Sequence, residues 1–240
     1  MKYAQDALDD YLHFLRVERQ LAANTLVSYE RDLKSYLHYL KEVEQLDSLR
    51  KVERVHILNH LRHLKENTKT SRTVARHISS IRSFHQFLIR ERVVDNDPTV
   101  HLEMPQMDKK LPNVLSIEEV DALIQAPDTK KANGIRDQAM LELLYGSGMR
   151  VSECINLNID DINLTMGFVR CFGKGGKERI IPLGKSALSA CKAYLDGPRQ
   201  ELVKAETKTD ALFINQRGKR LTRQGFWKLL KQHAQKAGIQ

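Results

Sequence analysis

The chain has 240 residues, and its 39 Lys and Arg against 30 Asp and Glu give a formal net charge of +9. This length allows two domains that each bury a core, and the basic excess favours a polyanionic partner such as nucleic acid. No apolar run is long enough to cross a membrane, and the first residues lack the apolar core of a signal peptide. We therefore expect a cytoplasmic protein that makes no membrane contact.

Four amphipathic helices are predicted in residues 1–94, where apolar residues recur at helical spacing. The first ends near Gln20, Asn24 caps the second, and the third and fourth span about 52–65 and 71–90. The third helix carries three histidines on one face, a spacing that could in principle bind zinc. No cysteine or carboxylate accompanies them, so we expect no metal site at His56, His60 and His63.

The fourth helix has the composition of a DNA-binding surface. Between residues 69 and 92 there are six basic residues and one acidic residue. A solvated face usually mixes its signs, so we favour contact with a phosphate backbone over exposure to water alone. The contacts that we expect lie on the face opposite the apolar stripe: Arg72, Arg76, Ser79 and Ser83.

The helical periodicity fails in residues 95–111, where Pro98 and Pro105 interrupt it, and we interpret this segment as a linker. The second domain, residues 112–240, opens with Ser116 and Glu119 at the spacing of a capping box, which predicts the start of a helix. Apolar spacing predicts further helices over 135–145, 185–194 and about 222–237.

Arg150 follows a stretch in which Gly146 and Gly148 can supply the positive φ that ends a helix. The apolar pattern restarts at Val151, so Arg150 is expected at the start of a new helix. A guanidinium brings a permanent charge and a planar fork of donors to this position, which suits a phosphate. Taken alone, an arginine after glycine usually marks a capped surface helix, so the pattern needs a second feature to indicate a phosphate site.

Two short apolar runs flank a turn rich in glycine and lysine between Phe168 and Leu183, which is typical of a β-hairpin. Lys174 and Lys177 lie in this turn, where the neighbouring glycines let the backbone approach a ligand closely. Glu178 follows Lys177 in place of the Ser or Thr of a P-loop, so we expect no nucleotide site.

The segment 217–236 carries seven basic residues and no acidic residue. Like charges crowded on one segment repel one another unless an anion relieves them, so the pattern favours DNA contact over an unpaired surface. We expect Arg220 and Arg223 to make this contact, and we expect Phe226 and Trp227 in the core.

The stretch from Tyr145 to Glu153, followed by residues 173–179, closely resembles the catalytic domain of tyrosine recombinases, and within them the Xer recombinases. Residues 24–33 are similar to the core-binding domain of the same family. The resemblance implies a mainly α fold with a small β-hairpin or sheet. It would comprise an N-terminal four-helix core-binding domain, which binds DNA, and a C-terminally truncated α+β catalytic domain.

The resemblance also implies roles for individual residues. Arg150 would contact the non-bridging oxygens of the scissile phosphate, and Lys174 would protonate the departing 5′ oxygen as a general acid. Glu153 would orient its neighbours, and Lys177 and Arg179 would contact DNA from the hairpin.

The implied reaction cuts and rejoins double-stranded DNA through a 3′-phosphotyrosyl intermediate, which needs neither ATP nor a metal ion. The implied partner is a second Xer-type recombinase, in a heterotetramer that joins two DNA sites and resolves chromosome dimers at cell division. The family's histidine-x-x-arginine motif and tyrosine nucleophile are expected beyond Gln240, so we expect residues 1–240 to bind DNA without forming a covalent adduct. Two alternatives stay open: a non-catalytic DNA-binding fragment, and a phage or mobile-element integrase.

Overall fold

The computed structural model describes residues 2–106, 114–173, 176–204 and 206–239. Contacts within the chain divide it into two compact units, Met1–Leu111 and Pro112–Gln240, which are described separately below. No helix among the described residues combines the length and the apolar character that a membrane span requires.

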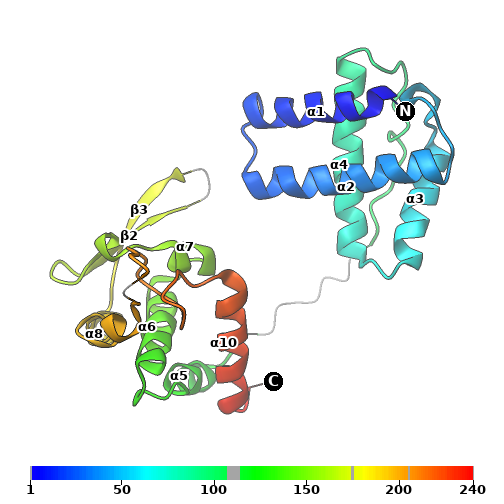
Figure 1. Cartoon of the computed structure of the whole chain (residues 1–240). Coiled ribbons are helices and arrows are strands. Elements are labelled where there is room, and N and C mark those ends of the chain that lie inside the picture. The colour runs from blue at the N-terminus through cyan, green and yellow to red at the C-terminus, as the bar shows by residue number, and fades with distance from the viewer. Residues whose placement is uncertain (1, 107–113, 174–175, 205, 240) are drawn as a thin grey trace. The chain divides into compact units, whose positions relative to one another are not determined.

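The first unit is built from four α-helices within the described residues (Figure 1). Their bounds are α1 Lys2–Val17, α2 Ala23–Glu42, α3 Arg54–Glu66 and α4 Ser71–Arg90, with a short 3₁₀ helix at Leu49–Lys51. Helices α1 and α2 pack side by side, and α4 crosses both of them. The predicted bounds of α4 are confirmed at both ends. The Thr70 hydroxyl accepts a hydrogen bond from the N–H of Thr73 and so caps the start of the helix.

The predicted cap of α2 is wrong. The helix begins at Ala23, so Asn24 already lies inside it and Ala22 holds the capping position without a side-chain hydrogen bond. The Asn24 carbonyl instead accepts a hydrogen bond from the Ser28 hydroxyl over 2.8 Å. A cap depends on where the preceding loop delivers the chain, which residue type alone does not specify.

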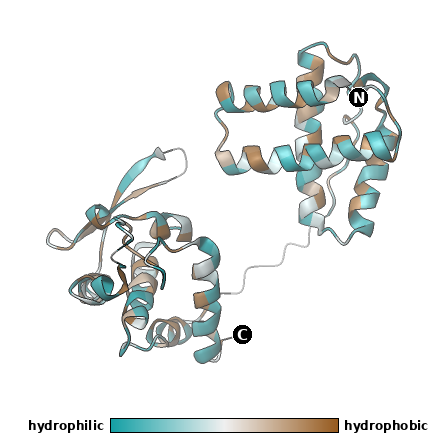
Figure 2. Ribbon diagram, viewed as in Figure 1, coloured by the Kyte–Doolittle hydropathy of each residue, from teal (hydrophilic) through white to brown (hydrophobic). Residues whose placement is uncertain are grey.

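Aromatic and aliphatic side chains from all four helices form the core of the first unit. Tyr11 of α1 lies between Phe84 and Phe87 of α4, with ring centroids 5.3 and 5.2 Å away. Figure 2 shows the resulting pattern, in which apolar and polar residues alternate along α1 and α2. Residues after α4 join this core, because Leu102 is buried and its carbonyl accepts a hydrogen bond from Arg82 over 2.7 Å.

The second unit combines helices with a three-stranded antiparallel sheet in the order β1-β2-β3. The helices are α5 Ile117–Gln125, α6 Ala132–Ser147, α7 Val151–Asn156, α8 Lys185–Leu195, α9 Pro198–Leu202 and α10 Arg223–Lys236, with a 3₁₀ helix at Ile159–Asp161. The strands are β1 Ile162–Asn163, β2 Phe168–Phe172 and β3 Glu178–Pro182. Helix α6 is central and packs against α5, α7, α8 and α9 (Figure 1).

These elements confirm the mainly α fold with a small sheet. The capping box is present, because the Ser116 hydroxyl accepts from the N–H of Glu119 over 3.2 Å and the Glu119 carboxylate accepts from the N–H of Ser116 over 2.7 Å. The hairpin is present as well, with β2 and β3 paired so that Cys171 faces Arg179.

A buried ion-pair chain ties α10 to α6. The Arg136 guanidinium, 2% exposed, donates to the Asp137 carboxylate at 2.6 and 2.8 Å and to the carbonyl of Ile214 at 2.8 Å. The second oxygen of Asp137 lies 2.9 Å from Nε2 of His233 on α10. The position of α10, and with it the position of its basic residues, therefore depends on these buried ion pairs.

Candidate active site and nucleic-acid interface

Arg150 lies at the junction of α6 and α7, as the sequence predicts. Gly148 ends α6 with a φ of +60°, in the left-handed region that favours glycine. Gly146 lies inside α6 and does not end it, so that part of the prediction is wrong. The buried Met149 anchors the turn, while the Arg150 side chain is 70% exposed. α7 has only six residues, so the guanidinium supplies most of the attraction for an anion.

Glu153 is the carboxylate around which this site is built. Its side chain is 6% exposed, and its Oε2 accepts from the backbone N–H of Arg150 over 2.8 Å. Its Oε1 accepts from Nη1 of Arg150 over 3.0 Å. Arg179 reaches the same carboxylate from β3, with Nη2 2.7 Å from Oε2 and Nη1 3.1 Å from Oε1.

The charge state of Glu153 follows from these contacts. The Arg179 hydrogen bonds are the largest influence and lower the pKa of Glu153 to about 2, with further help from Arg150 and against the opposing effect of burial. The carboxylate is therefore ionised at neutral pH. Two arginines share one negative charge, which leaves the site cationic and suited to a phosphate.

Of the two lysines predicted in the hairpin turn, the structure describes Lys177. Lys177 is exposed just before β3, and its carbonyl accepts from the N–H of Gly173 over 2.8 Å. Lys174, which the sequence predicts as the general acid, lies outside the described residues. Arg179 is expected as a DNA contact, but its guanidinium is engaged by Glu153 within the chain.

The basic segment before and along α10 divides into two kinds of arginine. Arg223 is exposed at the first position of α10. Arg220 donates to the carbonyls of Ile155 and Leu157 at 3.0 and 2.9 Å, so it satisfies the C-terminal end of α7. Sequence spacing does not reveal this role, because Arg220 lies more than sixty residues from both carbonyls along the chain.

A surface cavity joins α10 to the start of α7. It has a volume of about 340 Å³, and Val151, Arg223, Gln224, Phe226 and Trp227 line it. Phe226 is buried as predicted, but the prediction for Trp227 is wrong: its side chain is 56% exposed beside the cavity. Consecutive helical residues point in different directions, so only one of them reaches the core.

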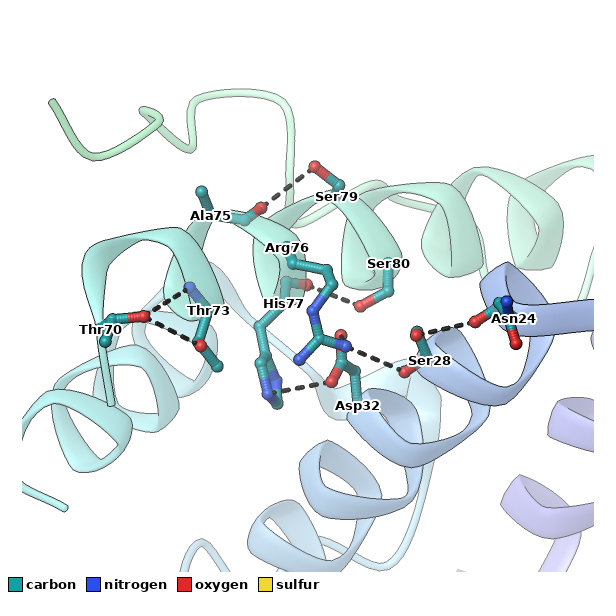
Figure 3. A network of polar contacts seen from close by, with 10 residues as sticks. All are labelled: Asn24, Ser28, Asp32, Thr70, Thr73, Ala75, Arg76, His77, Ser79 and Ser80. Atoms are coloured by element: carbon teal, nitrogen blue, oxygen red, sulfur yellow. Dashed lines mark hydrogen bonds and ion pairs between the residues drawn. The ribbon is translucent and has the colours of Figure 1, made fainter. Parts of the chain in front are cut away.

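The predicted DNA face of α4 is partly committed to internal contacts (Figure 3). Arg76 and His77 converge on the buried Asp32 of α2, with Nη1 of Arg76 2.8 Å and Nε2 of His77 3.2 Å from its carboxylate. The Ser79 hydroxyl donates to a backbone carbonyl of its own helix over 3.1 Å.

Burial raises the pKa of Asp32, although Arg76 opposes the shift, and burial lowers the pKa of His77 to about 4. Of the four predicted contacts on α4, Arg72 is exposed, while Arg76, Ser79 and Ser83 are half-buried. No group of three or more metal-ligating side chains occurs in the described ranges.

Both units match known protein families. Residues 8–92 match the phage integrase N-terminal SAM-like domain, and residues 113–240 match the phage integrase family. The chain is 52% identical over 233 residues to the tyrosine recombinase XerD of Oceanobacillus iheyensis, an alignment that covers 97% of this chain and 78% of that protein. It is 50% identical over 239 residues to XerD of Halalkalibacterium halodurans, covering 100% of this chain and 80% of that protein.

Solved structures show the same fold at lower identity. A lambda integrase (75–356) dimer bound to a COC′ core site matches with a TM-score of 0.73 and 18% identity, covering 98% of this chain and 82% of that chain. XerH in a post-cleavage complex with a palindromic difH substrate matches with a TM-score of 0.71 and 22% identity, covering 92% of this chain and 65% of that chain.

Proposed function

Because this chain belongs to the phage integrase family and is a tyrosine-type site-specific recombinase, we propose that Arg150 is the cation that binds the scissile phosphate of duplex DNA. One observation carries the proposal. The Arg150 guanidinium is largely exposed, yet Glu153, a buried carboxylate on the same short helix, fixes its position. A preorganised cation of this kind stabilises charge that develops in a transition state.

The chemistry assigns tasks to the neighbouring residues. A phosphodiester breaks without a metal ion when fixed cations neutralise its developing charge, a nucleophile attacks in line and an acid protonates the leaving oxygen. Arg150 serves the first task, and Glu153 holds it in place. The likeness to XerD proteins supports Lys174 as the acid and a 3′-phosphotyrosyl intermediate, whose bond energy is kept for rejoining the strand.

The DNA-binding surface is best assigned to the exposed basic residues. We assign Arg223 and Lys177 in the second unit and Arg72 in the first, since all three are exposed. Arg76, Arg179 and Arg220 act instead through contacts within the chain. A second Xer-type recombinase is the proposed partner, in a heterotetramer that resolves chromosome dimers at cell division.

The binding test compares the chain with its Arg150→Gln variant on a duplex enriched from a random-sequence pool. Fluorescence anisotropy at several salt concentrations gives the slope of log K against log salt. We expect weaker binding and a slope reduced by about 0.9, the value for one lost phosphate contact on B-DNA. Lys192→Gln, at an exposed position of α8, is the control and should leave the slope unchanged. Wild-type slope and affinity for Arg150→Gln would contradict the proposed contact.

The cellular role has a separate test. Deletion of the gene in its source organism should leave chromosomes joined at division, and the wild-type gene should restore their separation. The Arg150→Gln allele should fail to do so at equal protein abundance. Normal chromosome separation in the deletion strain would argue against dimer resolution while leaving the binding result intact.

A further inference from the structure

We propose that Arg179 is a positioning residue, which anchors the β2–β3 hairpin to Glu153 and thereby keeps the donors of Arg150 free for phosphate. This inference deepens the proposed function, because it rests on Arg150 as the phosphate-binding group. It gives Arg179 a task distinct from direct DNA contact.

The first observation is the unequal sharing of one carboxylate. Arg179 engages both oxygens of Glu153, at 2.7 and 3.1 Å, through its two terminal nitrogens, Nη2 and Nη1, as an end-on bidentate pair. The Arg150 side chain makes only one hydrogen bond to Glu153, at 3.0 Å. A guanidinium has five N–H donors, so most of the Arg150 fork stays available for a ligand. Without Arg179, each carboxylate oxygen loses one donor, and the vacated acceptor sites can draw the Arg150 guanidinium into a bidentate pair of its own.

The second observation concerns Gly173, the last described residue before the hairpin turn. A Cβ built on Gly173 would lie 3.0 Å from Nη1 of Arg179 and 3.7 Å from Oε1 of Glu153. The φ of Gly173 is not positive, so the backbone does not require glycine at this position. The missing side chain instead leaves the space in which the guanidinium and the carboxylate meet.

The hairpin makes this contact specific to one arginine. Arg179 faces Cys171 across the β2–β3 pair, and Cys171 is fully buried. The strand register therefore fixes the position of the Arg179 backbone, from which its side chain reaches Glu153. Arg170 belongs to the same hairpin and has a similar exposure, 42% against 39% for Arg179. Its guanidinium pairs instead with Asp161 at 3.3 Å and with Glu178 at 3.9 Å. Arg170 is therefore a matched control for the loss of a hairpin arginine.

The test has a readout that needs no DNA. Hydrogen exchange of the β2 and β3 amides is measured for the free chain and for Arg179→Gln, Gly173→Ala and Arg170→Gln. We expect exchange to rise at least several-fold in the first two variants, with a smaller change in the third. The midpoint of thermal unfolding followed at Trp227 shows that each variant is folded. Unchanged exchange in folded Arg179→Gln would overturn the anchoring role.

A double-mutant cycle then separates positioning from direct DNA contact. Arg179→Gln should weaken duplex binding several-fold, and Arg179→Lys should restore part of it. In a Glu153→Gln background, Arg179→Gln should weaken binding no further, because it acts through that carboxylate. An equal loss in both backgrounds would show that Arg179 contacts DNA itself, and would overturn the inference. If Arg150→Gln does not weaken binding, the proposed function fails, while the exchange data still decide whether Arg179 anchors the hairpin.

Discussion

Asp137 holds the buried ion-pair chain of the second unit together, and Asp137→Ala is expected to destabilise that unit strongly. The Arg136 guanidinium is only 2% exposed. After the substitution it keeps two neutral acceptors, the Ile214 carbonyl and the Asn133 side chain, but it has no counter-charge. It also releases His233 and with it the tie to α10. Removing one partner of a buried pair costs about 3–5 kcal/mol, since the remaining charge stays buried and uncompensated.

The chain offers a selective assay for this loss. Trp227 is the single tryptophan and lies on α10, so its fluorescence follows the second unit during guanidinium unfolding. With an m-value of about 4 kcal/mol per M, a loss of about 4 kcal/mol shifts the midpoint by about 1 M. Asp160→Ala, at an exposed position of the same unit, is the control and should change stability by less than about 0.5 kcal/mol. Equal shifts of the unfolding midpoint in the two variants would show that the buried ion pairs of Asp137 do not stabilise the second unit.

Three further predictions concern packing and protonation. Phe84→Ala removes a fully buried ring from the first core and should cost about 3–5 kcal/mol, measured by circular dichroism during urea unfolding. Gly134→Ala places a Cβ 1.9 Å from the carbonyl oxygen of Asp128, so the backbone must shift; we expect a lower Tm than for an exposed-helix alanine variant. Burial lowers the pKa of His60 to about 3 and of His85 to about 4. Since the unfolded chain then binds more protons below about pH 6.5, the Tm of the first unit should fall as pH drops from 6.5 towards 4, and a flat Tm would contradict this.

Local patterns predict the elements whose residues interact with near neighbours. Helix α4 begins and ends where its apolar stripe indicates, and the Ser116 capping box forms because both of its partners lie within one turn. The Gly148 turn is predictable for the same reason. The cap of α2 is not, because the loop before it decides where the helix starts.

The site is only partly contained in such patterns. The position of Arg150 follows from local spacing, but the pairing of Arg179 with Glu153 spans 26 residues and depends on the hairpin register. Asp137 and His233 lie 96 residues apart and meet only because the fold packs α10 against α5 and α7, beside the start of α6. Arg220 belongs to the basic segment that predicts DNA contact, but its guanidinium donates to carbonyls at the end of α7. Charge alone does not distinguish an arginine that binds DNA from one that completes the fold.

The most direct test of the central claim locates the phosphate that Arg150 binds. A selected duplex is synthesised with a neutral methylphosphonate at one position at a time, and binding is measured for the wild-type chain and for Arg150→Gln. We expect one position at which the neutral group weakens wild-type binding several-fold but leaves the variant unaffected, because the lost partner is the same. If every position weakens both proteins equally, Arg150 does not bind a specific phosphate, and the proposed site is wrong.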